Sequence, residues 1–229
     1  MQLTQLQYLK EIGIDVWVDR NTPALDQPQM KKISLLDEAK LTTYASLEAL
    51  QKQVTDYTFN IMHETNTQYI FGTGDVDADW LIIGEATVNE EDKKGDVANS
   101  RAALLFHNML LALGLVGEQV FITNILKMRA PNKRDPKKED VQACSSFLKQ
   151  QIDKIQPKVI VCFGHIATLN LLQDDTPIGK MRGEVHTYPD FNIPVVATYH
   201  PAYLLRAPKE KRKAWEDLKL AMKSYQEAP

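Results

Sequence analysis

Short apolar runs alternate with amphipathic stretches from about residue 79 to the end of the chain. Short runs that are almost wholly apolar are typical of parallel strands buried on both faces. The stretches between them place apolar residues at helical spacing, so helices would cover the sheet on both sides. This pattern predicts an α/β fold, a three-layer α/β/α sandwich with a central, mostly parallel sheet. The predicted strands are 80–83, 120–124, 159–163 and 194–199, and the predicted helices are 100–113, 138–155, 165–172 and a tail that begins at 208.

The first 30 residues follow a different pattern, which we interpret as an N-terminal helical arm and linker (1–30) ahead of the main domain (31–229). An amphipathic helix at 3–12 precedes an apolar stretch at 14–18, and a proline-containing linker follows. A second helix at 35–54 joins this arm to the sandwich. The apolar arm residues either pack against the domain or form a peptide that docks on a partner protein. The candidate docking residues are Leu6, Leu9, Ile14, Val16 and Trp17.

Composition and charge are those of an ordinary globular protein. The 229 residues are 44% hydrophobic and 25% charged, and the formal net charge is -3. There is no long apolar run and no signal peptide, so we expect a cytoplasmic protein that does not contact a membrane. Positive charge gathers locally at 127–138 and 206–213, where it either meets phosphates or forms solvated faces balanced by neighbouring acids.

Three of the predicted strands end in polar residues. Glu85 follows the first strand, Asn124 ends the second, and His200 follows the last. Ligands bind at the carboxyl ends of the strands in open α/β sheets, so we expect these three side chains to line one pocket. Asn124 and His200 also have ordinary structural interpretations, in which the asparagine caps a loop and the histidine is buried and hydrogen-bonded.

Several motifs follow one another in a fixed order between about Leu47 and the end of the chain. They are Gly84-Glu85-Ala86, Thr123-Asn124, Arg182-Gly183 and His200-Pro201-Ala202, the last followed by Leu204-Leu205-Arg206. This ordered set resembles the uracil-DNA glycosylase superfamily, most closely its iron–sulfur branch, family 4. The resemblance implies the α/β/α fold of that superfamily for this part of the chain.

The resemblance also implies cleavage of the N-glycosidic bond of uracil, after the nucleotide has been extruded from the base stack. In the family, an asparagine at the position of Asn124 reads the uracil edge. A histidine at the position of His200 stabilises the departing uracil anion, and Glu85 or the region 89–91 would assist the attacking water. A leucine of the histidine loop would wedge the duplex. The expected DNA-contacting residues are Leu204, Leu205, Arg206, Lys133 and Arg134.

Iron–sulfur members of the family hold their cluster with four cysteines. The corresponding positions here are Tyr57, Asn60, Met128 and Cys144. One thiolate cannot hold a cluster, so the sequence predicts that the cluster is lost and that the chain has no cofactor and no metal site. The second cysteine, Cys162, lies in a predicted strand and is expected to be a buried apolar residue.

The base-binding motifs depart from the family as well. The family's Gly-Glu-Ala-Pro-Gly motif ends here in Thr87 and Val88, and the phenylalanine that stacks on the extruded uracil falls at about Ala98. No aromatic residue stands close to Ala98 in the sequence. Base–aromatic stacking is worth about 1–3 kcal/mol, so its loss predicts substrate binding weakened by roughly 5- to 150-fold.

Two functions compete on these observations. Residues 5–17 resemble the N-terminal peptide of the bacterial DNA polymerase III psi subunit, which in its family docks on the clamp loader while the folded domain binds a chi subunit. That resemblance and the damaged stacking site favour a non-catalytic accessory subunit, with clamp-loader subunits and a chi-like subunit as partners. The alternative is an active uracil-DNA glycosylase, favoured by the retained Asn124 and His200. A third possibility is a DNA-binding or regulatory protein that works without a clamp loader.

Overall fold

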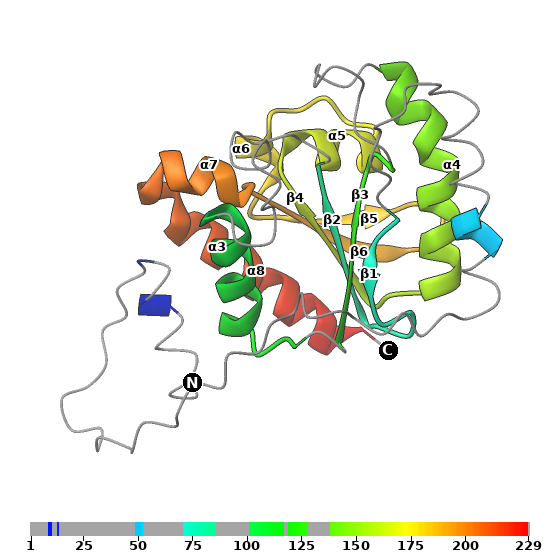
Figure 1. The fold of residues 1–229 in the computed structure, drawn as a ribbon. Coiled ribbons are helices and arrows are strands. Elements are labelled where there is room, and N and C mark those ends of the chain that lie inside the picture. Colours follow the sequence, from blue (N-terminus) through cyan, green and yellow to red (C-terminus); the bar gives the residue numbers. More distant parts are fainter. Residues whose placement is uncertain are drawn as a thin grey trace.

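A mostly parallel, six-stranded sheet forms the centre of the part of the chain that the structure describes (Figure 1). The structure is a computed structural model, and it describes residues 9–10, 13, 49–52, 71–85, 101–116, 119–127 and 138–228. The strand order is β1-β3-β2-β4-β6-β5. The four central strands are parallel: β2 (Trp80–Gly84), β3 (Val120–Asn124), β4 (Val159–Phe163) and β6 (Ile193–Thr198). The two edges are antiparallel: β1 (Thr73–Gly74) and β5 (Val185–Tyr188).

Alternate residues of the central strands are buried on opposite faces of the sheet. In β2, Leu81 and Ile83 belong to one hydrophobic cluster and Trp80 and Ile82 to the other. The first face is covered by α4 (Lys138–Ile155) and α5 (His165–Leu172) (Figure 1). The second is covered by α3 (Arg101–Ala112), α7 (Pro201–Arg206) and α8 (Lys211–Glu227). The predicted three-layer α/β/α sandwich is therefore confirmed.

The apolar runs located each parallel strand to within one residue at either end. The sequence did not predict the edge strands β1 and β5, which are short and largely exposed. It also did not predict α7 or the short helix α6 (Ile178–Met181) that precedes β5. Within the described residues, no helix combines the length and the apolarity needed to cross a lipid bilayer.

The structure describes little of the predicted arm. Leu9 and Lys10 are helical, and Leu9 is fully buried in the cluster that α3, α7 and α8 form with the sheet. This residue packs on the domain, so it is not exposed to a partner. The other candidate docking residues, Leu6, Ile14, Val16 and Trp17, lie outside the described residues. Residues 49–52 of the joining helix are helical, and the division of the chain at residue 30 stays a prediction.

Candidate active site

A cavity of about 600 Å³ opens at the carboxyl ends of the parallel strands. Strand β4 lies between β2 and β6, so Gly164, which follows β4, is flanked by Glu85 after β2 and His200 after β6. The pocket expected from the polar strand ends therefore exists, and it contains two of the three predicted side chains. Its polar and aromatic lining includes Glu85, His165, Tyr199, His200, Tyr203 and Arg206.

Asn124, the third predicted side chain, is not among the residues that line this cavity. Strand pairing sets it opposite Gly84, the residue before Glu85. Its side-chain Oδ1 lies 2.8 Å from the position that a Cβ atom on Gly84 would occupy. The missing side chain at position 84 therefore lets the asparagine amide reach across the end of β2.

Glu85 points its carboxylate at the beginning of α5. Its Oε1 accepts a hydrogen bond from the Ile166 backbone nitrogen at 2.6 Å. The chain passes close by at Gly164, whose φ of 100° favours glycine and whose Cβ, if present, would lie 2.8 Å from the Glu85 Cδ. Burial raises the pKa of Glu85 above its usual range, although the backbone donors of Ile166 and Ala167 oppose that shift. The carboxyl is thus largely desolvated and fixed in direction.

His200 begins α7 as its N-cap. Its Nδ1 accepts a hydrogen bond from the Ala202 backbone nitrogen at 3.2 Å, and Pro201 occupies the first helical position. A ring nitrogen that accepts a hydrogen bond carries no proton, so this contact places the imidazole proton on Nε2. His200 is therefore a neutral hydrogen-bond donor through Nε2.

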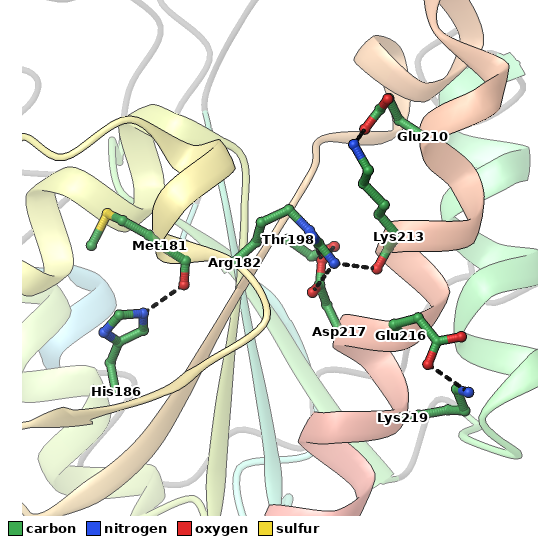
Figure 2. Close-up of polar contacts among 9 residues, drawn as sticks. All are labelled: Met181, Arg182, His186, Thr198, Glu210, Lys213, Glu216, Asp217 and Lys219. Atoms are coloured by element: carbon green, nitrogen blue, oxygen red, sulfur yellow. Dashed lines mark hydrogen bonds and ion pairs between the residues drawn. The ribbon is translucent and has the colours of Figure 1, made fainter.

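A buried ion pair anchors the strand that leads to His200 (Figure 2). Asp217 on α8 is fully buried and accepts hydrogen bonds from Arg182 Nε at 2.9 Å and Nη2 at 2.6 Å. It also accepts one from the Thr198 hydroxyl at 3.0 Å, at the end of β6. Arg182 Nη2 donates a further bond to the Lys213 carbonyl at 2.8 Å. These contacts join α6, β6 and α8 just before the cavity.

A second buried network anchors the strand that ends in Asn124. Lys127 is fully buried, and its Nζ donates to the Thr123 hydroxyl at 2.6 Å, to the Asn124 carbonyl at 3.0 Å and to Gln151 Oε1. Gln151 Nε2 and the Thr123 hydroxyl both donate to the Phe71 carbonyl at 2.8 Å. Burial lowers the pKa of Lys127 to about 7. The sequence placed this lysine in a positive cluster with two interpretations, phosphate binding or a solvated face, whereas the structure buries it inside the fold.

A comparison with known families identifies the fold around this cavity. Residues 71–219 match the family described as "Uracil DNA glycosylase superfamily". The chain belongs to this superfamily. The match begins just before β1 and extends into α8, so it includes both anchoring networks and the whole cavity.

Curated relatives of this glycosylase-superfamily chain cover most of its length. The type-4 uracil-DNA glycosylase of Archaeoglobus fulgidus is 36% identical over 180 residues, which is 76% of this chain and 90% of the relative. That of Sulfurisphaera tokodaii is 36% identical over 181 residues, covering 76% and 82%. That of Thermotoga maritima is 35% identical over 162 residues, covering 70% and 83%.

These matches overturn the prediction of a non-catalytic clamp-loader subunit. Type-4 glycosylases at 31–36% identity are matched over most of the chain, which favours the alternative of an active glycosylase. Nothing in the matches supports a psi-like arm, a clamp-loader partner or a chi-like subunit. The prediction failed because it gave too much weight to a short resemblance in the first residues of this superfamily member.

The prediction that the chain has lost its cofactor is contradicted by the comparisons. The matched relatives are type-4 glycosylases, the branch to which the resemblance assigns an iron–sulfur cluster. The described residues nevertheless do not fit a four-cysteine cluster. Cys144 Sγ accepts a hydrogen bond from the Lys127 backbone nitrogen at 3.4 Å, and burial raises the pKa of the Cys162 thiol, which disfavours the thiolate form. Tyr57, Asn60 and Met128 lie outside the described residues.

Only some of the expected DNA-contacting residues are exposed in the structure. Leu204 is 1% exposed and packs in the core with Leu105 and Trp215, so it cannot wedge a duplex. Leu205 is half-buried against the same cluster, whereas Arg206 is exposed at the cavity. Lys133 and Arg134 lie outside the described residues.

Two tyrosines at the cavity were not predicted from the sequence. Tyr199 and Tyr203 line the cavity, with ring centroids 5.0 Å apart at an interplanar angle of 41°. The sequence prediction had placed the missing stacking aromatic near Ala98, which lies outside the described residues. Helical spacing could have found Tyr203, because buried Pro201 and Leu204 define the inner side of α7 and leave Tyr203 and Arg206 on the outer side.

Proposed function

We propose that this chain is a uracil-DNA glycosylase, which hydrolyses the bond between uracil and deoxyribose in DNA. The observation that carries the proposal is the cavity itself, because it brings a desolvated carboxyl, Glu85, and an imidazole donor, His200, to one space. A volume of about 600 Å³ lies in the range of small-molecule sites. The type-4 uracil-DNA glycosylases matched over most of the chain support the same assignment.

The reaction breaks the bond between C1′ of the sugar and N1 of uracil, and the bonding electron pair leaves with the base. Positive charge develops on the sugar and negative charge on uracil, as in other glycoside cleavages. His200 donates a hydrogen bond from Nε2 to the developing uracil anion. The imidazole is already neutral and oriented by Ala202, so it stabilises this charge without first transferring a proton.

Glu85 supplies the complementary charge on the other side of the cavity. Its ionised carboxylate accepts a hydrogen bond from the water that attacks C1′. The water oxygen forms the new bond to C1′, and one water proton passes to Glu85 and from there to solvent. The uracil anion takes up one proton from solvent at N1, so the protons balance. The products are free uracil and an abasic sugar, and the Ile166 donor holds the carboxylate in position throughout.

Asn124 is assigned the recognition of the uracil edge. Its amide lies close to Gly84, the residue before Glu85, and an amide can donate and accept at once. DNA is the substrate on this proposal. Arg206 is exposed at the cavity, and Lys209, three residues further along the chain, is also exposed; both would meet phosphates of the bound strand.

Two matched substitutions test the proposal. Uracil release is measured in single turnover on single- and double-stranded oligonucleotides that contain one deoxyuridine. His200→Ala removes the donor to the anion and is expected to lower the rate by roughly 10²- to 10³-fold. Glu85→Gln removes the base and is expected to lower it by roughly 10²- to 10⁴-fold.

Glu216→Gln provides the control for Glu85→Gln, because it removes an exposed carboxylate of α8 whose ion pair with Lys219 lies on the surface. Its rate should equal that of the unaltered chain. The proposal fails if the unaltered chain releases no uracil, or if both cavity substitutions leave the rate unchanged.

A further inference from the structure

The side chain of Tyr203 is exposed in a way that packing does not explain. It is 39% exposed and lies at the cavity, between His200 and Arg206 on the chain. Four large apolar side chains of the described residues are exposed, and Tyr203 is the single aromatic among them. An exposed ring beside a polar cavity offers a flat apolar surface to a ligand.

Tyr203 is the outer member of a row of three planar groups, Arg182, Tyr199 and Tyr203, which we call the ladder. The Tyr199 ring lies 5.0 Å from the Tyr203 ring, and the Arg182 guanidinium carbon lies 5.8 Å from the centre of the Tyr199 ring. Tyr199 is half-buried, so one end of the ladder is covered and the other end, Tyr203, is open. A cation over one face of an aromatic pair holds the pair in place.

The ladder is fixed at its covered end by the anchor shown in Figure 2. Arg182 makes two hydrogen bonds to the fully buried Asp217 and a third to the Lys213 carbonyl. Asp217 also holds Thr198, the residue before Tyr199. Tyr199 is therefore held in two ways: the Arg182 guanidinium lies over its ring, and its neighbour Thr198 is hydrogen-bonded to Asp217.

The helix that carries Tyr203 is fixed as well. Pro201 and Leu204 are buried on its inner side, and the Tyr203 backbone nitrogen donates to the His200 carbonyl at 2.9 Å. Of the two leucines expected to wedge DNA, Leu204 faces the core and Leu205 is half-buried against the same cluster, whereas Tyr203 is exposed and lines the cavity. Tyr203 is thus the most exposed of the three side chains and the one that lies at the cavity.

We propose that Tyr203 stacks on the base next to the extruded uracil, and that it closes the gap the uracil leaves in the strand. This inference rests on the proposed function. Tyr203 is assigned to the neighbouring base because its ring lies at the exposed rim, while Glu85 and His200 bind the extruded nucleotide further in.

The test is a double-mutant cycle between the protein and the DNA. Binding is measured by fluorescence anisotropy to a single-stranded oligonucleotide that carries 2′-fluoro-2′-deoxyuridine, whose glycosidic bond resists cleavage. In matched oligonucleotides the base on the 5′ side, the 3′ side or both sides of the uracil is replaced by an abasic spacer. Tyr203→Ala should weaken binding to the intact strand by roughly 5- to 150-fold.

The same substitution should cost less than about threefold when both neighbouring bases are absent, because the stacking partner is already gone. Tyr203→Phe keeps the ring and should bind like the unaltered chain, which separates stacking from the hydroxyl and from misfolding. Val116→Ala is the control, because Val116 is equally exposed at 39% but precedes the amino end of β3, whereas the cavity lies at the carboxyl ends of the parallel strands.

An equal loss on all oligonucleotides would show that Tyr203 contacts the uracil or the backbone and would overturn the inference, as would no loss on the intact strand. Uracil release by the unaltered chain is measured in parallel. Release without an effect of Tyr203→Ala refutes the stack alone, and coupling without release refutes the enzymatic function alone. Failure to bind any of the oligonucleotides refutes both.

Discussion

The buried pair of Arg182 and Asp217 gives a prediction that can be worked from its contacts. Asp217 is 0% exposed and Arg182 is 15% exposed, so neither charge is well solvated once its partner is removed. Two hydrogen bonds at 2.6 and 2.9 Å join them. Breaking such a pair by removing one partner costs about 3–5 kcal/mol, because the remaining charge is buried alone. We expect the lower end of that range for Asp217→Leu, since water still reaches part of the Arg182 side chain.

The assay is a double-mutant cycle of urea unfolding followed by circular dichroism. Asp217→Leu and Arg182→Met should each lower the free energy of unfolding, and the double variant should be no less stable than either single variant. Replacing both charges by apolar groups leaves no uncompensated charge, so the coupling should be at least about 2 kcal/mol. Additivity to within about 0.5 kcal/mol would refute the reasoning, since the two side chains would then not depend on each other.

Three further predictions concern the cavity and its supports. Burial raises the pKa of Glu85, which acts as a carboxylate, so kcat/KM should fall as pH drops through that raised pKa; a pH–rate profile with the same acid limb in Glu85→Gln would contradict this. Gly164→Ala should abolish most uracil release because its Cβ would meet the Glu85 carboxylate, whereas Gly114→Ala, with a φ of 79° and no neighbour within 4 Å, should keep full activity. Leu204→Ala should lose about 2–5 kcal/mol in thermal or urea unfolding, and the exposed Leu104→Ala less than about 0.5 kcal/mol; equal losses would argue against the core position of Leu204.

The sequence predicted the central sheet well because its strands are buried on both faces. A strand such as β4, with every residue buried, must be apolar throughout, and that requirement is visible in a single sequence. The edge strand β5 exposes Val185 and Thr187 on one face, so it need not be apolar throughout and nothing in its composition marked it. The two-residue β1 is too short to carry a pattern at all.

The candidate site was predictable where strand ends defined it and not where side-chain direction or distant contacts did. Glu85 and His200 follow apolar runs, and the topology of a parallel sheet brings them together. The partners Arg182 and Asp217 are separated by 35 residues, and no local pattern links them. Leu204 was misplaced because a motif fixes residue type but not the side of the helix on which the residue lies.

The functional prediction failed for a related reason. It counted the departures at Thr87, Val88 and Ala98 along the chain and concluded that the base had lost its stacking partner. The cavity lining contains two tyrosines, Tyr199 and Tyr203, which a count along the chain to Ala98 could not find. The missing motif residues were a weak argument against activity, because type-4 glycosylases match most of the chain in spite of them.

The most direct test of the central claim is the chemical product formed from a uracil-containing strand. The unaltered chain is incubated with a single-stranded oligonucleotide that carries one deoxyuridine, and free uracil and the abasic strand are measured by mass spectrometry. The account predicts equal amounts of the two products, with the yield lost in His200→Ala under the same single-turnover conditions. Recovery of an intact deoxyuridine strand after incubation with the folded, unaltered chain would contradict it.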